Sequence, residues 1–274
     1  MIEIIKSFIL GIVEGITEWL PVSSTGHLIL VNEFIKTKGS FTASSFFPLY
    51  LYVIQLGAIL AVVTLFFNKL NPFSGKKSDQ EKKDTWQMWF KVVVGCVPAG
   101  VIGLALNDLM EAIETWQVVS AMLIVYGVAF LIIERTGRKT AVLSMNDMSY
   151  KTAFLIGLFQ VLSIVPGTSR SGSTILGGML VGCSRELAAE FSFFMAIPIM
   201  LGVSFIKIVT YEGVITSSEW LILAVGMIVS YLVSLAAIRF LMSYVRNHSF
   251  ALFGWYRIVL GITVIGYFLI SSII

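Results

Sequence analysis

The sequence predicts an all-α polytopic membrane protein that forms one integral membrane domain over residues 1–274. Its residues are 57% hydrophobic and only 13% charged, and its mean hydropathy is +0.90, far above the usual range of a soluble domain. A membrane span needs about 18 or more mostly apolar residues, and six stretches meet this requirement. They are 46–67, 89–107, 117–134, 190–210, 219–241 and 250–272.

Two further apolar stretches are interrupted by polar residues and are too short to span a bilayer. Each consists of two helical pieces around a proline and a small polar loop, 4–20 with 26–35 and 152–165 with 174–183. As a helix, 152–165 reaches only about 21 Å, whereas the hydrocarbon core is about 30 Å thick. We therefore expect two re-entrant helix hairpins beside the six full spans, which gives ten helical segments.

The basic residues predict the orientation in the membrane. If both hairpins return to the side from which they enter, four basic residues lie on the side of the termini, namely Lys6, Lys36, Lys38 and Lys207. Twelve lie on the other side: Lys69, Lys76, Lys77, Lys82, Lys83, Arg135, Arg138, Lys139, Lys151, Arg185, Arg239 and Arg246. The positive-inside rule places the richer side in the cytoplasm and both termini outside. The net charge of +3 is too small to predict a nucleic-acid partner.

The two halves of the chain, about 1–134 and about 150–274, have the features of an internal repeat. At offsets of 145 or 146 the aligned pairs are Gly11 with Gly157, Glu14 with Gln160, Pro21 with Pro166, and Gly26 with Gly172. Each half has one hairpin and three spans, so the second half is expected to be inverted. Inverted repeats with broken helices place a site near the membrane midplane, where the two loops meet. The alternative is chance similarity between two glycine- and serine-rich turns.

The first hairpin carries two carboxylates, Glu14 and Glu18, at a spacing that places them on one helical face. Charged groups within a membrane are costly and are functional candidates by default. Two carboxylates, completed by water and phosphate oxygens, suit Mg²⁺ or Ca²⁺. The alternative is a polar face that lines a crevice, with one of the two acids protonated.

The loop after Pro21 offers the parts of an anion site. Ser23, Ser24 and Thr25 supply hydroxyls, and the N-terminus of the helix over 26–35 supplies free amides. His27 is suited to act as a general acid or base, or as a nucleophile that accepts a phosphoryl group. The alternative is a loop histidine that caps a helix.

The loop of the second hairpin, 167–174, is the strongest single signal. It places Arg170 at membrane depth among hydroxyl residues, namely Ser169, Ser171, Ser173 and Thr174. An arginine can bind phosphate oxygens bidentately. We expect Ser173 or Thr174 to cap the helix over 174–183. The alternative for Arg170 is a salt bridge to Glu14 or Glu18, which could also alternate with phosphate binding.

Two other charged residues, Glu190 and Arg257, are each expected near the cytoplasmic end of a span, where they would form a structural ion pair. Cys96 and Cys183 lie in apolar surroundings, so a disulfide is not expected.

Two long motifs, EGITEWLPVSSTGH at 14–27 and PGTSRSGST at 166–174, resemble those of the bacterial undecaprenyl-diphosphatases, also called bacitracin-resistance proteins. The resemblance covers the whole chain. It implies an enzyme of the bacterial cytoplasmic membrane that hydrolyses undecaprenyl diphosphate to the monophosphate and inorganic phosphate, which recycles the lipid carrier for peptidoglycan synthesis.

The same resemblance implies a divalent cation and an active site open to the outer face of the membrane. It implies functional roles for Glu14, Glu18, Ser24, His27, Ser169, Arg170 and Thr174, with the nucleophile undecided between His27, Ser24 and water.

Two other functions fit the predicted architecture. A transporter or polyprenyl-phosphate flippase fits inverted repeats with re-entrant hairpins. An ion channel lined by Glu14 and Glu18 is the third reading. The expected partners are a polyprenyl diphosphate substrate and membrane lipid, and a homodimer is left open.

Overall fold

The structure, a computed structural model, describes residues 1–37, 39–136 and 140–271. Three basic residues of the orientation argument, Lys38, Arg138 and Lys139, lie outside these ranges. Within the described ranges the chain is helical, and its β pairing is limited to one isolated bridge between Val142 and Cys183. The predicted all-α class is therefore confirmed. Both cysteines are free and buried, as expected.

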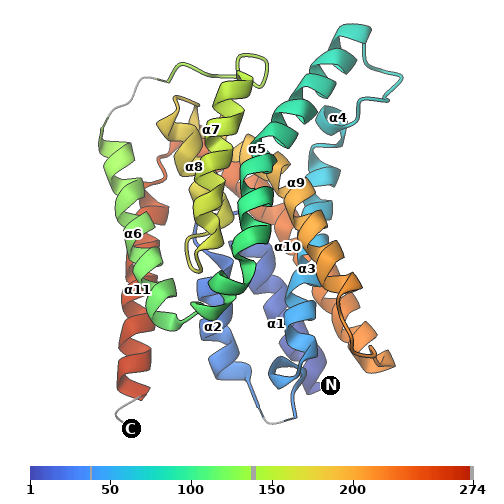
Figure 1. The fold of residues 1–274 in the computed structure, drawn as a ribbon, viewed down its shortest axis with the longest axis vertical. Coiled ribbons are helices and arrows are strands. Elements are labelled where there is room, and N and C mark those ends of the chain that lie inside the picture. Colours follow the sequence, from blue (N-terminus) through green and yellow to red (C-terminus); the bar gives the residue numbers. More distant parts are fainter. Residues whose placement is uncertain (38, 137–139, 272–274) are drawn as a thin grey trace.

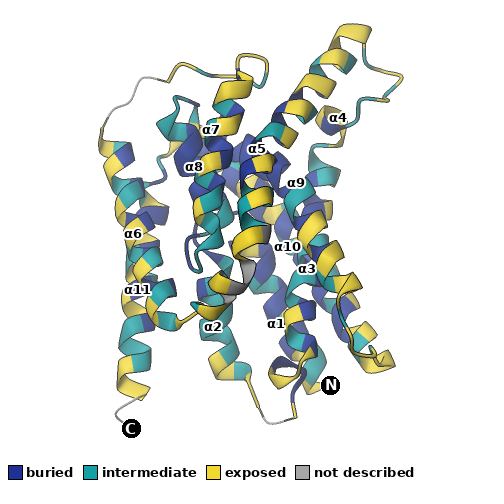
Figure 2. Cartoon of the chain, viewed as in Figure 1, coloured by how far each residue is buried: buried dark blue, intermediate teal, exposed yellow. Residues whose placement is uncertain are grey.

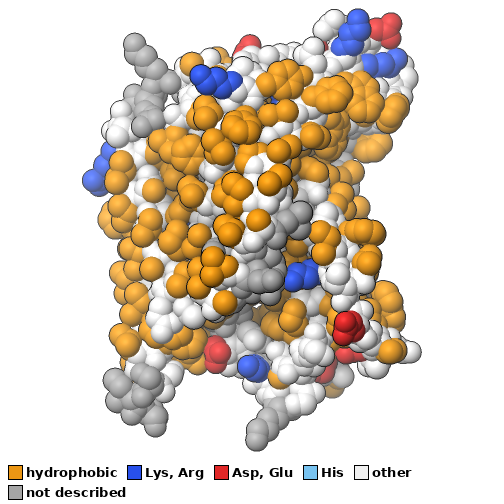
Figure 3. Space-filling view, viewed as in Figure 1, with side chains coloured by type: hydrophobic (Ala, Val, Ile, Leu, Met, Phe, Trp, Pro, Cys, Tyr) orange, Lys and Arg blue, Asp and Glu red, His pale blue; other side chains and the backbone are white. Residues whose placement is uncertain are grey.

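Six long helices are apolar enough to cross a membrane: α3 (Phe46–Leu65), α5 (Asp79–Ala112), α6 (Trp116–Arg135), α9 (Arg185–Val209), α10 (Ser217–Asn247) and α11 (Ala251–Ser271). All six predicted spans are thus present in a multi-pass membrane protein. Hydrophobic side chains cover most of the face between the two ends of the molecule (Figure 3). Such a surface suits contact with lipid.

The helix ends differ from the predicted edges because capping residues, not hydropathy, set them. Helix α5 begins at Asp79 rather than at residue 89, after a capping box in which Ser78 and Glu81 bond each other's amides. Helix α10 begins with the same device, formed by Thr216 and Glu219. Polar first turns extend these helices beyond their apolar stretches.

Two helix pairs are too short to count among the six spans. The first is α1 (Ile2–Thr17) with α2 (Ser24–Ile35), and the second is α7 (Tyr150–Val161) with α8 (Arg170–Leu180) after the 3₁₀ turn η2 (Leu162–Ile164). Figure 1 shows these hairpins in opposite halves of the bundle, with their turns near the middle and both chain termini at one end. The remaining short elements are η1 (Phe41–Ala43) and α4 (Phe67–Leu70).

Each hairpin packs against a span of the other half of the sequence. Helix α1 lies on α10, and α7 lies on α5. The aligned glycines Gly11 and Gly157 permit these contacts, since a Cβ atom at Gly11 would lie 2.8 Å from the carbonyl oxygen of Gly226, and one at Gly157 would collide with that of Gly95. Each half of the chain thus supplies a packing partner for the hairpin of the other half. The inverted relation between the halves stays a prediction.

The core surrounds the second hairpin. Figure 2 shows the buried residues concentrated at α8 and along α9. Phe191, Phe193 and Phe194 of α9 are fully buried, and Trp19, next to the first turn, packs edge-on against Phe193 with ring centroids 5.3 Å apart. Irregular backbone at membrane depth requires protein or a wet cavity around it, and this core surrounds both turns with protein.

Candidate active site

The turns of the two hairpins have the same local structure. Ser23 and Ser169, each three residues before the aligned glycines Gly26 and Gly172, have φ angles of 73° and 75° and are the only non-glycine residues with positive φ in the described chain. Each serine caps the next helix by accepting a hydrogen bond from the amide of a glycine, at 3.4 Å from Gly26 and 3.1 Å from Gly172. A left-handed conformation is costly for an L-residue, so the turn needs this cap to hold it.

The prediction that Ser173 or Thr174 caps the helix after the second turn is wrong. Helix α8 begins at Arg170, and both residues lie inside it, fully buried. Ser173 donates to the hydroxyl of Tyr126 at 3.2 Å, and Thr174 bonds the carbonyl of Arg170 at 2.9 Å. Several hydroxyl residues follow one another here, and only the left-handed backbone of the capping serine identifies which of them begins the helix.

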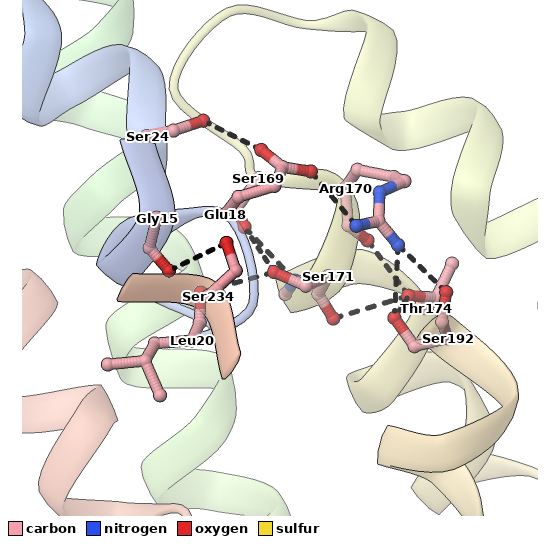
Figure 4. Close-up of polar contacts among 11 residues, drawn as sticks. Gly15, Glu18, Leu20, Ser24, Ser169, Arg170, Ser171, Thr174, Ser192 and Ser234 are labelled. Atoms are coloured by element: carbon pink, nitrogen blue, oxygen red, sulfur yellow. Dashed lines mark hydrogen bonds and ion pairs between the residues drawn. The ribbon is translucent and has the colours of Figure 1, made fainter. Parts of the chain in front are cut away.

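Arg170 joins the second hairpin to the first. Its Nη2 atom lies 2.9 Å from Oε1 of Glu18, and its Nη1 atom donates to the carbonyl of Ser192 at 2.8 Å (Figure 4). The guanidinium also lies over the ring of Trp19, 5.7 Å from its centroid. The salt bridge to Glu18, which the sequence offered as an alternative, is therefore present.

Both carboxylate oxygens of Glu18 have a partner. While Oε1 faces Arg170, Oε2 accepts a hydrogen bond from Ser24 at 3.2 Å. Ser171 adds a second link between the hairpins by donating to the carbonyl of Leu20 at 3.1 Å (Figure 4). Ser169 lies 3.2 Å from Ser171, hydroxyl to hydroxyl. The two motifs thus meet in one cluster, which consists of the carboxylate of Glu18, the guanidinium of Arg170 and the hydroxyls of Ser24, Ser169 and Ser171.

Glu14 lies one helical turn before Glu18 and is only 1% exposed. Its Oε1 atom has no hydrogen-bond partner among the described residues. A buried carboxyl group without a partner is unfavourable unless it is protonated or faces a cation or water. The described residues contain no group of three His, Cys, Asp or Glu side chains able to hold a metal ion. Glu14 and Glu18 supply only two carboxylates, so a hard cation there would need water or phosphate oxygens as its remaining ligands.

Other buried polar atoms without partners gather on the same two hairpins. Within the described ranges they include Trp19 Nε1, Arg170 Nε, Thr168 Oγ1 and both side-chain polar atoms of Gln160. Most buried polar groups in proteins are hydrogen-bonded to protein or to ordered water. These atoms indicate that water or a polar ligand completes the interior of the hairpins.

His27 faces away from this cluster. Its Nδ1 atom lies 2.7 Å from the carbonyl oxygen of Ser23, and its Nε2 atom lies 2.6 Å from the hydroxyl of Tyr256 on α11. In the described chain no hydrogen bond joins His27 to Ser24 or Glu18. Thr25 is half-buried at the same turn, in the first turn of α2. Sequence reasoning missed Tyr256, because nothing in an apolar helix indicates which tyrosine meets a distant histidine.

Arg257 forms hydrogen bonds with both hairpin turns. The predicted ion pair between Arg257 and Glu190 is wrong. The guanidinium is fully buried and donates to three carbonyls of the hairpin turns, Pro21 at 3.2 Å, Gly167 at 3.0 Å and Thr168 at 2.9 Å. Glu190 instead pairs with Lys69 at 2.9 Å. Broken helices leave carbonyls without partners deep in the protein, and an arginine satisfies several at once. The signal was present in the sequence, since Arg257 interrupts an otherwise apolar span.

The chain is similar in sequence to proteins of one known family. The family model of the bacitracin resistance protein BacA matches residues 7–263. An undecaprenyl-diphosphatase of Enterococcus faecalis is 54% identical over 272 residues, which cover 97% of this chain and 98% of the relative. Those of Limosilactobacillus fermentum and Desulfitobacterium hafniense are 54% and 50% identical, over 98% and 100% of this chain and 98% and 99% of the relatives.

Proposed function

Because the chain belongs to the bacitracin resistance protein BacA family, we propose that it is an undecaprenyl-diphosphatase, as its relatives are named. It hydrolyses the phosphoric anhydride of undecaprenyl diphosphate and releases undecaprenyl phosphate and inorganic phosphate. This returns the lipid carrier to peptidoglycan and cell-wall synthesis and accounts for the resistance to bacitracin in the family name. The observation that carries the proposal is the meeting of Arg170, Glu18 and Ser24 at the contact of the two hairpins.

Arg170 and the helix N-termini would bind the diphosphate. The first amides of a helix have no partner within it, and those of α2 and α8 flank Arg170 and Ser24. A phosphate oxygen competes with the carboxylate of Glu18 for the guanidinium, and the free Nε atom of Arg170 offers a further donor. Ser169, Ser171, Ser23 and Thr25 lie at the same turns and would surround the bound diphosphate. Ser173 and Thr174 bond other side chains and would support α8 from behind.

Glu14 and Glu18 would hold the divalent cation, Mg²⁺ or Ca²⁺. When bound, the cation supplies charge neutralisation at the diphosphate and at the leaving oxygen. If Arg170 moves to the phosphate, Glu18 becomes free for this role, and the unpartnered Oε1 atom of Glu14 lies one turn away on the same helix.

His27 would attack the terminal phosphorus, or take the proton of Ser24 or water as that oxygen attacks. In either case the new bond to phosphorus forms as the bond to the bridging oxygen breaks, and undecaprenyl phosphate leaves. If the attacking atom belongs to His27 or Ser24, water then attacks the phospho-enzyme, the bond between phosphorus and the side chain breaks, and inorganic phosphate is released. Ser24 already donates a hydrogen bond to Glu18, which holds its hydroxyl in the cluster. Trapping a phospho-enzyme and mapping the modified residue by mass spectrometry distinguishes His27 from Ser24.

The orientation in the membrane belongs to the proposal too. The excess of basic residues on one side supports a cytoplasmic location for that side and an outer location for both termini. The resemblance to the family supports a site that opens to the outer face. The lipid substrate would reach the site from the membrane. Labelling of single cysteines introduced near residues 2 and 146, with a reagent that does not cross membranes, tests this orientation. We also propose a homodimer, which native mass spectrometry would detect.

Phosphate release by purified protein in detergent micelles tests the function. The wild type releases phosphate from undecaprenyl diphosphate, and Arg170→Ala, Glu18→Gln and His27→Ala do not. Arg246→Ala, which alters an exposed ion pair at the end of α10, is the control and keeps its activity. A polyprenyl-phosphate flippase or an ion channel would release no phosphate in micelles, where there is no membrane to cross. Retained release in all three site variants overturns the proposed site.

A further inference from the structure

The hydrogen bonds of His27 fix which of its nitrogens carries the proton. The carbonyl oxygen of Ser23, 2.7 Å from Nδ1, can only accept a hydrogen bond, so a proton resides on Nδ1. In the neutral ring Nε2 then has the free lone pair and accepts from the hydroxyl of Tyr256 at 2.6 Å. The nitrogen that would act as a base or nucleophile is therefore the one that Tyr256 binds.

Tyr256 contacts His27 through its ring as well as its hydroxyl. The two rings are nearly parallel, with an interplanar angle of 6° and centroids 5.5 Å apart. The stack limits rotation of the imidazole, and the hydrogen bond sets the direction of Nε2. Two independent contacts thus orient one side chain.

The position of Tyr256 on α11 is unusual for a polar group. Its neighbours on that helix face, Leu252, Trp255 and Val259, are 57%, 53% and 61% exposed, which is typical of a lipid-facing stripe. Tyr256 itself is 45% exposed. It therefore stands between His27 and the surface along which a lipid substrate would arrive.

We propose that Tyr256 is a positioning residue for His27, which keeps Nε2 free of a proton and oriented until the diphosphate arrives. The inference rests on the proposed function, because it assigns Nε2 the reacting lone pair. If Nε2 takes a proton from the attacking Ser24 or water, the oxygen–hydrogen bond breaks and a bond between nitrogen and hydrogen forms. Tyr256 then changes from donor to acceptor without losing its own proton, and the charged imidazole keeps a partner.

The alternative is that Tyr256 uses His27 only to satisfy its own hydroxyl in an apolar environment. In that case the loss of the hydroxyl would alter neither the tautomer of His27 nor the chemical step. The two interpretations are separated by kinetics together with a direct observation of the imidazole.

The kinetic test uses Tyr256→Phe, which keeps the stacked ring and removes only the hydroxyl. We expect kcat to fall about tenfold, the effect of one lost hydrogen bond, with KM within about twofold, because the hydroxyl does not bind substrate. Tyr267→Phe is the matched control on the same helix, since Tyr267 contacts Phe34 and Phe268 through its ring. An unchanged kcat, or a change confined to KM, overturns the proposal.

The second readout is the ¹⁵N spectrum of His27, recorded on protein labelled at histidine. His248→Gln removes the other histidine, which is exposed and stacks on Tyr244 at the end of α10. We expect the Nδ1-protonated form in the parent, where both hydrogen bonds hold the ring. In Tyr256→Phe the ring has lost the bond at Nε2, so we expect it to leave the carbonyl of Ser23 in part of the molecules and to show a mixture of tautomers. An unchanged tautomer overturns the proposal whatever the rates. If His27→Ala keeps its activity, the proposed function of His27 fails, yet this spectrum still reports the contact.

Discussion

The Nη2 atom of Arg170 lies 2.9 Å from Oε1 of Glu18, and this ion pair joins two hairpins across 152 positions of sequence. The side chains are only 11% and 9% exposed, so both charges are largely removed from water. A buried ion pair contributes little net stability, because desolvation offsets the attraction, but the loss of one partner is costly. The pair is therefore suited to exchange: a phosphate that binds Arg170 must leave Glu18 with another partner, such as a cation.

Removing one member of this pair should destabilise the protein more than removing both. We expect Arg170→Met alone to lower the free energy of unfolding by about 3–5 kcal/mol, because it leaves a buried carboxylate uncompensated. Arg170→Met with Glu18→Gln should recover most of that loss, while phosphate release stays abolished in both proteins. Thermal unfolding in detergent and phosphate release measure the two effects.

The exposed pair of Arg246 and Glu186, whose side chains are 63% and 44% exposed, is the control for this experiment. An exposed ion pair contributes about 0–1 kcal/mol, so Arg246→Met should leave the unfolding temperature almost unchanged. Equal stability of the single and double variants at Arg170 and Glu18 would contradict the argument.

The two capping serines allow a test of the matched turns. At a positive φ, alanine loses the cap and also keeps an unfavourable backbone, whereas glycine loses only the cap. We expect Ser23→Ala and Ser169→Ala each to be about 1 kcal/mol less stable than the corresponding glycine variants. Thermal unfolding of the four variants measures this order of stability. Ser149, an N-cap with φ of −81°, is the control at which glycine should offer no such advantage.

Arg257 should be essential for the alignment of the turns. Lysine has fewer donors and no planar fork, so Arg257→Lys cannot bond the carbonyls of both turns as the guanidinium does. We expect Arg257→Lys to lower phosphate release by about a hundredfold through misplacement of the catalytic groups. The backbone amides of both hairpin turns should also exchange their hydrogens faster in Arg257→Lys than in the wild type. Normal exchange at both turns, with normal activity, would show that other contacts hold them.

The sequence predicted the spans, the hairpins and the two motifs, because hydropathy and interruptions in it are local properties. Helix starts were less predictable, since the capping serine at 169 stands among other hydroxyl residues. The partners of Arg257 and His27 were not predictable at all. Arg257 bonds backbone carbonyls, which every residue possesses, and Tyr256 meets His27 across 229 positions of sequence. Such contacts depend on how α11 packs, which a single sequence does not encode locally.

Glu14 provides the test of the cation. The predicted repeat aligns Glu14 with Gln160, an uncharged side chain of the same shape that is buried to the same 1% exposure. We therefore expect Glu14→Gln to fold with an unfolding temperature no lower than that of the wild type, because it removes the cost of a buried acid without a partner.

Although Glu14→Gln should be at least as stable as the wild type, its phosphate release should depend on a higher concentration of the cation. Removal of divalent cations with a chelator should abolish phosphate release by the wild type, and added Mg²⁺ or Ca²⁺ should restore it. In Glu14→Gln the concentration of Mg²⁺ that gives half of the maximal rate should rise about tenfold or more, since one of two carboxylate ligands is lost. Gln160→Glu, which places an acid at the equivalent position of the second hairpin, should leave that concentration unchanged. A Glu14→Gln variant with the cation dependence of the wild type would place the cation elsewhere, and would leave the unpartnered Oε1 atom of Glu14 to water alone.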